Sequence, residues 1–322
     1  MAESRFRAMG TDCHVLVVAP DPIGDELLAL ARERVEILEQ CWSRFRPTSE
    51  LSHLNATAGR GPQPVSGDLL LLVETMTRAW QSTGGLFDPT VLTSMRSLGY
   101  DADFAQVQAR PASSLADVTL AVAPGMSGVQ VEREPSTVGL PAGIGLDPGA
   151  IGKGLAADVI ADELWAAGAD GVLVNLGGDI AIAGVAGEGE AWAIGLEDER
   201  QPADHPNRVL RVLEFPVGTD RVGIATSTTL KRRWAQGRRH HIIDPRTGAM
   251  STSELVQVTV VAASAWEAEA HATTALLLPP SGAAAWLRDR DLTGVLLTET
   301  DEIHTDEINT DEINTDEETT DG

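Results

Sequence analysis

The segment 238–248, RRHHIIDPRTG, places two histidines, an aspartate and three arginines within eleven residues. Its end, Asp-Pro-Arg-Thr-Gly, is typical of a tight turn, and the four residues before that turn alternate like a strand. Neighbouring side chains on a strand point to opposite faces, so only one of His240 and His241 can face a site. A neutral histidine there could act as a general base, but a structural histidine is the more common case.

A glycine-rich turn with one lysine, GLDPGAIGKGLAAD, opens a helix in the middle of the chain. Gly154 follows Lys153 where a nucleotide-binding P-loop needs Ser or Thr, so that motif is absent. The free N–H groups and the dipole of a helix N-terminus favour an anion. A tight turn with a surface lysine explains the segment equally well.

Three further stretches carry weaker signals. Gly177 and Gly178 in VNLGGDIAIAG would let a ligand approach the backbone, or would form a hairpin turn. Glu269 and Thr273 in AWEAEAHATTALLL are four residues apart, so they share one helix face and could both reach Mg²⁺. Asp88 in GGLFDPTV is explained by a turn alone.

The elements that must position these residues alternate between strands and amphipathic helices. Helical spacing predicts long helices from about residue 22, from residue 67 and from residue 150, and two shorter ones after residue 265. Many of the strands are joined by hairpin-length turns, which favours an α+β fold with mixed or antiparallel sheets over a parallel βαβ series. No linker divides residues 1–298, so we expect one catalytic unit.

The net charge of −24 over 322 residues is concentrated at the C-terminus, because residues 299–322 hold eleven acids and no Lys or Arg. High charge and a five-residue repeat predict disorder in this tail. The remaining acidic body excludes a nucleic-acid or membrane-surface protein. No signal peptide or apolar membrane span is evident, and the two cysteines fit reduced core thiols, so we expect a cytoplasmic protein.

The order of these motifs resembles the FAD:protein FMN transferase family, also called ApbE, from about Met9 to about Leu278. HIIDPRTG and GAIGKGLAAD are the most specific segments, and AMGTDCHV, SRFRPTSELSHLNA and ATSTTLKRRW add to the match. The resemblance implies a T-fold-like α+β architecture with packed helices. It also implies an enzyme that binds FAD and Mg²⁺, attaches FMN to a Thr or Ser of an acceptor flavoprotein and releases AMP.

The resemblance also implies roles for individual residues. His241 would be the catalytic base, with Asp244 or a backbone group fixing its tautomer, and Lys153 would bind the pyrophosphate. Phe45 stands where the family usually has a stacking Tyr, and it keeps the π face. The implied Mg²⁺ ligands are the Ala150 carbonyl, Glu269 and Thr273. The implied FAD-binding residues are Met9, Gly10, Thr11, Phe45, Asp88, Lys153, Asp158, Gly177, Gly178, Ser227 and His241.

Two departures from the family pattern leave alternatives open. Glu269 replaces the usual Asp, and a register shifted by one would instead place Thr274 on the family threonine and Ala270 at the acidic position. Thr228 replaces a glycine, which would strain the backbone if its φ were positive. These departures keep open a flavin-binding protein without turnover. The resemblance also leaves open a pyrophosphatase that converts FAD to FMN and AMP, because the family includes members that hydrolyse FAD.

Overall fold

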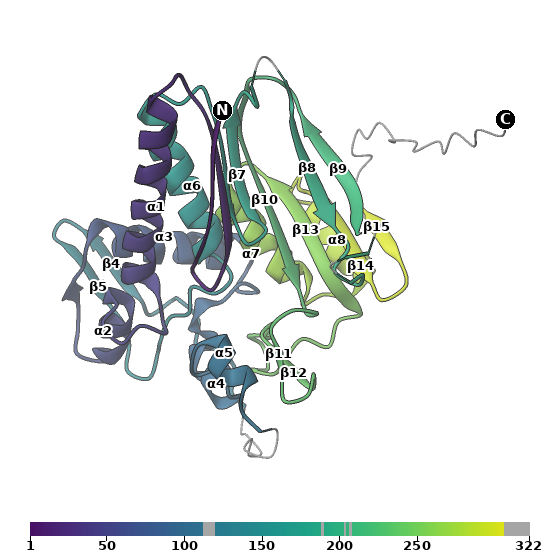
Figure 1. Ribbon diagram of the computed structural model, residues 1–322. Helices are drawn as coiled ribbons and strands as arrows, with labels where there is room; N and C mark the ends of the chain where they lie inside the picture. Colours follow the sequence, from purple (N-terminus) through teal and green to yellow (C-terminus); the bar gives the residue numbers. More distant parts are fainter. Residues whose placement is uncertain (112–119, 188–189, 203, 206–207, 306–322) are drawn as a thin grey trace.

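The computed structural model describes residues 1–111, 120–187, 190–202, 204–205 and 208–305. Its centre is an eight-stranded sheet in which every neighbouring pair is antiparallel (Figure 1). In spatial order the strands are β1 (Ala2–Ala8), β2 (Thr11–Val18), β6 (Gly171–Leu176), β7 (Asp179–Gly184), β10 (Thr219–Thr228), β13 (Leu255–Ala262), β14 (Thr293–Thr298) and β15 (Glu302–His304).

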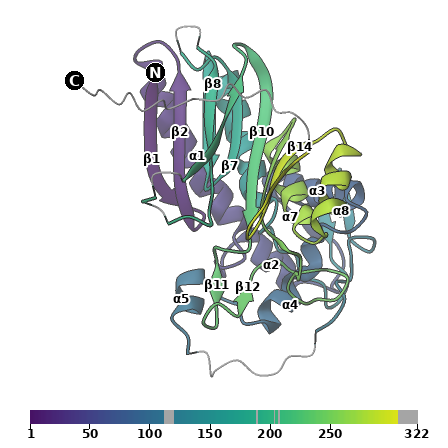
Figure 2. The same ribbon diagram turned by 90° about the vertical axis from the view of Figure 1, so that its right-hand side faces the viewer.

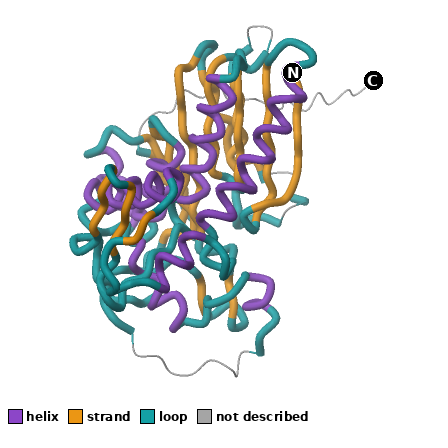
Figure 3. The backbone as a smooth tube through the Cα atoms, turned by 90° about the vertical axis from the view of Figure 1, so that its left-hand side faces the viewer, coloured by secondary structure: helices purple, strands orange, loops and turns teal. Residues whose placement is uncertain are grey.

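Both faces of the central strands are covered, which is why β6 and β7 are almost continuously buried and mostly apolar. Val172 and Val174 belong to the core under the helices, whereas Leu173 belongs to a separate core on the opposite face. The helices α1 (Ile23–Trp42), α6 (Gly152–Ala166) and α7 (Ala265–Ala275) form one layer, visible in front of the strands in Figure 3. The antiparallel pair β8 (Trp192–Glu197) and β9 (Val209–Phe215) supplies the opposite core.

Smaller elements lie around one end of the sheet and beside α1 (Figure 2). Beside α1 are α3 (Gly67–Ser82) and α2 (Glu50–Ala56), with the strands β3 (Gln63–Pro64), β4 (Gln130–Arg133) and β5 (Ser136–Gly139). At the sheet end are η1 (Pro89–Val91), α4 (Leu92–Ser97), α5 (Phe104–Gln108) and the hairpin β11 (Arg233–Trp234) with β12 (Arg239–His240). The last helix, α8 (Pro280–Arg288), contacts β14.

The structure confirms the expected α+β fold with antiparallel sheets, and it corrects the tail. Residues 302–304 were expected to be disordered, but they form β15, and Ile303 pairs with Leu296 of β14. The buried Thr305 extends this contact with β14, because its N–H donates to the Gly294 carbonyl at 3.1 Å. The rest of the acidic repeat, residues 306–322, lies outside the described residues. No helix among the residues the structure describes is long and apolar enough to span a membrane.

Helices α6 and α7 are joined by one buried carboxylate and one glycine. Asp158 accepts hydrogen bonds from the N–H groups of Ala265 and Trp266, both at 2.9 Å, and so caps the start of α7. Burial raises the pKa of Asp158 to about 6. A side chain at Gly154 would overlap the Ala265 backbone, so the helices approach this closely only with glycine there. These two residues therefore set the position of α7 relative to α6.

We predict that Asp158→Ala lowers the free energy of unfolding by about 2 kcal/mol, because two buried N–H groups lose their acceptor. Asp162 is the matched control, since it lies one turn along α6 with an exposed side chain paired to Arg221. We expect Asp162→Ala to change the free energy by less than about 0.5 kcal/mol. Urea denaturation of both variants measures this, and equal effects would refute a capping role for Asp158.

Candidate functional site

Lys153 lies between two buried carboxylates, and this cluster is the centre of the candidate site. Its Nζ contacts Asp179, and it lies 3.1 Å from Glu269 Oε1. Glu269 Oε2 accepts the Gly154 N–H at 2.8 Å. The Asp179 and Glu269 side chains are 1% and 3% exposed, whereas that of Lys153 is 19% exposed. Two carboxylates against one ammonium leave a net negative charge that only the lysine side connects to solvent.

The protonation of Lys153 is set by opposing effects. Burial lowers the pKa of its ammonium below the ordinary value, and the nearby Glu269 carboxylate acts in the opposite direction. The positive charge of Arg232 lowers the same pKa further. Lys153 is therefore a partly buried cation next to two buried carboxylates.

The sheet brings the predicted residues to one end of the molecule. Asp179 begins β7, opposite Ala225 on β10, and Ser227 lies two residues farther along β10. Gly177 and Gly178 form the turn before β7, with φ of +74° and +97°. A side chain at Gly177 would overlap Thr11 at the start of β2. The β1–β2 turn, which precedes Thr11, and the turn of Gly177 and Gly178 are therefore neighbours at the end of the sheet that holds Asp179.

The expected metal ligands include a hydroxyl that faces this region. Thr273 lies one turn after Glu269 on α7, and its Oγ1 is 2.9 Å from Ser227 Oγ. Thr274 points elsewhere, because its buried hydroxyl donates to the Ala270 carbonyl at 2.8 Å. The geometry favours the register with Glu269 and Thr273 over the shifted alternative.

The donors in this cluster fit a magnesium ion only together with other oxygens. No group of three or more His, Cys, Asp or Glu side chains suitable for a metal occurs in the part of the chain that the structure describes. One or two carboxylates, a hydroxyl and a carbonyl are hard oxygen donors, and Mg²⁺ commonly combines such a small set with water and substrate phosphates. Glu269 and Thr273 fit that use, and the Ala150 carbonyl lies just before α6.

His241 follows β12 directly and is held in its neutral form. Burial lowers the pKa of His241 well below its usual value, and the charges of Arg232 and Lys153 lower it further. Within the described chain, its buried Nδ1 has no hydrogen-bond partner. A buried, unpaired ring nitrogen is costly unless a ligand or water meets it, so it marks the ring as part of a site.

Asp244 does not orient His241 as the resemblance implied. Its carboxylate binds its own turn, accepting the Arg246 N–H at 2.9 Å and the Arg246 guanidinium at 2.7 Å. Burial opposes ionisation, but these hydrogen bonds hold the pKa of Asp244 below its ordinary value. The Asp-Pro-Arg-Thr-Gly segment is therefore a turn closed by its own ion pair. The residue of this stretch that belongs to the candidate site is His241, which precedes the turn.

Two aromatic rings enclose an arginine that the sequence analysis did not single out. The Arg44 guanidinium lies 4.1 Å from the Phe45 ring centroid and 4.6 Å from that of Tyr100. Arg44 also forms a buried ion pair with Asp147 at 3.1 Å, just before the glycine-rich turn. Phe45 is 37% exposed, so one ring remains open to a planar ligand. The adjacent Arg-Phe pair in the sequence was the available signal.

Several other expected site residues have structural partners in the fold. Met9 and Gly10 form the β1–β2 turn with positive φ, and Glu39 accepts the Met9 N–H at 2.8 Å. Asp88 is buried and accepts from both the N–H and the hydroxyl of Thr90. Thr228 continues β10 without a positive φ, and its hydroxyl donates to a β13 carbonyl, so the replacement of glycine causes no strain there.

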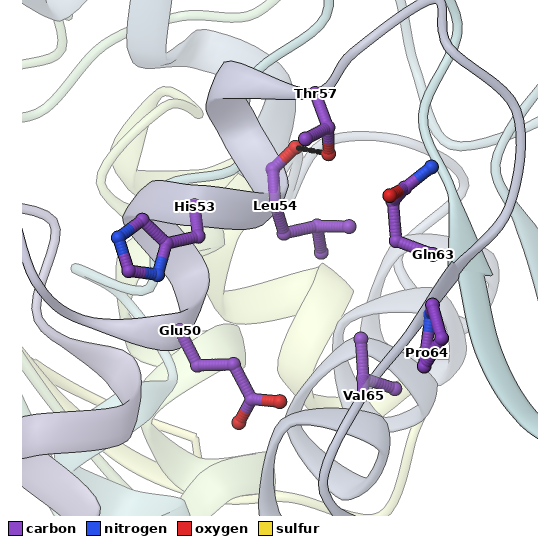
Figure 4. Close-up of a pocket in the computed structure, with 7 residues that line it drawn as sticks. All are labelled: Glu50, His53, Leu54, Thr57, Gln63, Pro64 and Val65. Atoms are coloured by element: carbon purple, nitrogen blue, oxygen red, sulfur yellow. Dashed lines mark hydrogen bonds between the residues drawn. The ribbon is translucent and has the colours of Figure 1, made fainter.

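Figure 4 shows a separate cavity of about 150 Å³ between α2 and β3. Glu50 binds the N–H of Ser66, which is the N-cap of α3, at 2.6 Å, so this carboxylate has a structural partner. The exposed His53 lies at the same cavity. None of the expected site residues lines this cavity, and the Lys153 cluster lies outside it.

Comparison with known proteins identifies the family. The model of the ApbE family matches residues 9–297. The chain belongs to the ApbE family. A relative from Treponema pallidum, named FAD:protein FMN transferase, is 30% identical over 313 residues, covering 87% of this chain and 80% of that protein. A relative of the same name from Klebsiella pneumoniae is 28% identical over 302 residues, covering 92% and 84%.

Solved ApbE structures share the fold of this chain. The ApbE protein of Thermotoga maritima aligns with a TM-score of 0.79 at 21% identity, covering 95% of this chain and 97% of that one. The flavin transferase ApbE of Vibrio cholerae aligns with a TM-score of 0.73 at 24% identity, covering 94% and 97%. At these identities the likeness shows the common fold, and the curated relatives carry the functional comparison.

We predict that the His241 ring does not titrate between pH 6 and pH 8. Its lowered pKa means that the neutral ring predominates above the folded-state pKa, so no proton is bound or lost in this window. Histidine-selective NMR measures this directly, and His241→Ala identifies the resonance. A midpoint near 6.5 for that resonance would contradict the buried, neutral assignment.

Proposed function

We propose that this protein is a Mg²⁺-dependent FAD:protein FMN transferase that attaches FMN to a Thr or Ser of an acceptor flavoprotein and releases AMP. Family membership over most of the chain supports this activity, as do relatives of that name matched over four fifths or more of their length. The observation that carries the proposal is the Lys153 cluster, where a cation and two buried carboxylates meet at the start of α6.

The chain provides positive groups for the diphosphate of FAD and oxygen donors for the metal ion. Lys153 and the N-terminus of α6 favour the diphosphate of FAD. Glu269, Thr273 and the Ala150 carbonyl would hold the ion. When bound, Mg²⁺ would neutralise negative charge that develops on the diphosphate. Phe45 offers an exposed ring for the isoalloxazine to stack on.

The proposed reaction breaks the phosphoanhydride bond of FAD and forms a phosphate ester bond to the acceptor. The acceptor hydroxyl oxygen attacks the phosphorus on the FMN side, and the bond from that phosphorus to the bridging oxygen of AMP breaks. His241 takes the hydroxyl proton, because its ring is neutral and its buried Nδ1 has no partner within the described chain. Lys153 stays close to the leaving phosphate, where its charge favours departure of AMP.

The two neighbouring threonines of α7 test the metal assignment. We predict that Thr273→Val raises the Mg²⁺ concentration for half-maximal transfer about tenfold, because a hydroxyl donor is lost. Thr274→Val is the matched control, since that hydroxyl donates to its own helix, and we expect its Mg²⁺ dependence to be unchanged. Mg²⁺ titration of AMP release measures both variants. An effect of Thr274→Val alone would restore the shifted register.

The activity itself is tested by incubation with FAD, Mg²⁺ and a cell extract. We expect AMP release together with an FMN-sized mass increase on an acceptor protein, and a loss of both with His241→Ala. Steady AMP and free FMN without any adduct would instead identify an FAD pyrophosphatase. Tightly retained FAD with no AMP would identify a flavin-binding protein without turnover.

A further inference from the structure

The segment 231–239, KRRWAQGRR, is a local concentration of positive charge in an acidic protein. Five of the nine residues are basic, whereas the whole chain has a net charge of −24. The segment contains the β11–β12 hairpin, at the same end of the molecule as α4 and α5 (Figure 2). An acidic ligand would be repelled by most of this protein and attracted here.

The arginines of this hairpin lack acidic partners, which is unusual for the molecule. Lys231 pairs with Glu199, but none of the four arginines forms an ion pair with a carboxylate of the described chain. Three of them donate to backbone carbonyls, for example Arg239 to Leu98 at 2.7 Å. Most other arginines, such as Arg34 with Asp68, are neutralised by a carboxylate. The hairpin charge is therefore available to a partner.

The hairpin is anchored, so its charges are presented in a fixed arrangement. Trp234 is buried with Tyr100, and its indole N–H donates to the Leu98 carbonyl at 3.0 Å. Nearby acids are already engaged, because Asp101 pairs with Arg110 and Asp103 caps α5. Neither carboxylate pairs with a hairpin arginine.

The hairpin also adjoins the site at which transfer would occur. Its second strand ends at His240, and His241 is the next residue. Arg232 adopts a left-handed backbone with φ of +46°, at the start of the hairpin. Arg233 and Arg238 are exposed. One end of the basic segment thus lies at the site, and Arg233 and Arg238 face solvent.

We propose that the β11–β12 hairpin is the docking surface for an acidic segment of the acceptor protein, next to the Thr or Ser that receives FMN. This inference rests on the proposed function. A nine-residue hairpin is too small for the extended phosphate contacts of a nucleic acid, and the acidic surroundings oppose such a polymer. A short acidic peptide segment matches the size and the charge of the surface.

Two ten-residue peptides provide the probe. One has a central Thr flanked by four Asp or Glu residues, and the other replaces these acids with Asn and Gln. We expect fluorescence anisotropy to show binding of the acidic peptide only, with affinity that falls as salt is raised. The same titration is made with a full-length variant whose eight acids in 306–322 are changed to amides, because the tail would compete. Absence of an acidic preference in both proteins would overturn the proposal.

A charge-reversal pair locates the surface. Arg233→Glu with Arg238→Glu is expected to weaken acidic-peptide binding at least about tenfold, because two attractive charges become repulsive. The matched control is Arg60→Glu with Arg288→Glu, which makes the same change of net charge at exposed positions away from the hairpin. Equal weakening by both pairs would show a general charge effect and would overturn the proposal.

The same variants separate this inference from the proposed function. FAD affinity, and the rate of AMP release at saturating acceptor, are expected to be unchanged by the hairpin pair, while the KM for the acceptor rises. A loss of FAD affinity would show that the arginines bind the nucleotide instead, and would overturn the docking proposal. Peptide binding without any FMN transfer would leave the docking surface intact and refute the proposed activity.

Discussion

The buried contact of Lys153 with Asp179 and Glu269 is the interaction on which the site depends. It joins the first turn of α6, the start of β7 and the middle of α7, three elements that are far apart in the sequence. Removing ions from water is costly, so two buried carboxylates persist only with a compensating cation and hydrogen bonds. Lys153 and the Gly154 N–H supply these to Glu269. The excess negative charge that remains suits a divalent cation.

The other buried acids stabilise the scaffold around this cluster. Asp158 fixes the start of α7, and thereby the height of Glu269 relative to Lys153. Asp147 fixes Arg44 beside the Phe45 ring. Similar carboxylates thus serve different purposes according to their partners. Asp158 and Asp147, which bind only backbone N–H groups or arginine, hold the fold, whereas Asp179 and Glu269 meet the partly exposed lysine and form the centre of the candidate site.

Sequence reasoning succeeded where spacing alone determines geometry. The four-residue spacing of Glu269 and Thr273 predicted that they share one helix face, and the turn lengths predicted antiparallel hairpins. The contacts between segments that are distant in the sequence could not be predicted in this way. Asp179 begins a buried strand, and no local pattern shows that Lys153 reaches it. Asp158 was expected at the flavin, but the α6–α7 packing that gives it a capping role depends on the whole fold. The start of the acidic repeat also pairs with β14, since a sheet edge supplies partners that composition does not reveal.

The central claim, that Lys153 and Glu269 act as one unit on bound FAD, is tested most directly by a double-mutant cycle. Lys153→Met, Glu269→Gln and the double variant are compared for Mg²⁺-dependent AMP release from FAD in the presence of the acceptor, after circular dichroism has verified that each is folded. The account predicts that each single change lowers the rate on the order of 100-fold and that the double variant is scarcely slower than either. Independent, multiplying losses, or full activity in either single variant, would contradict it.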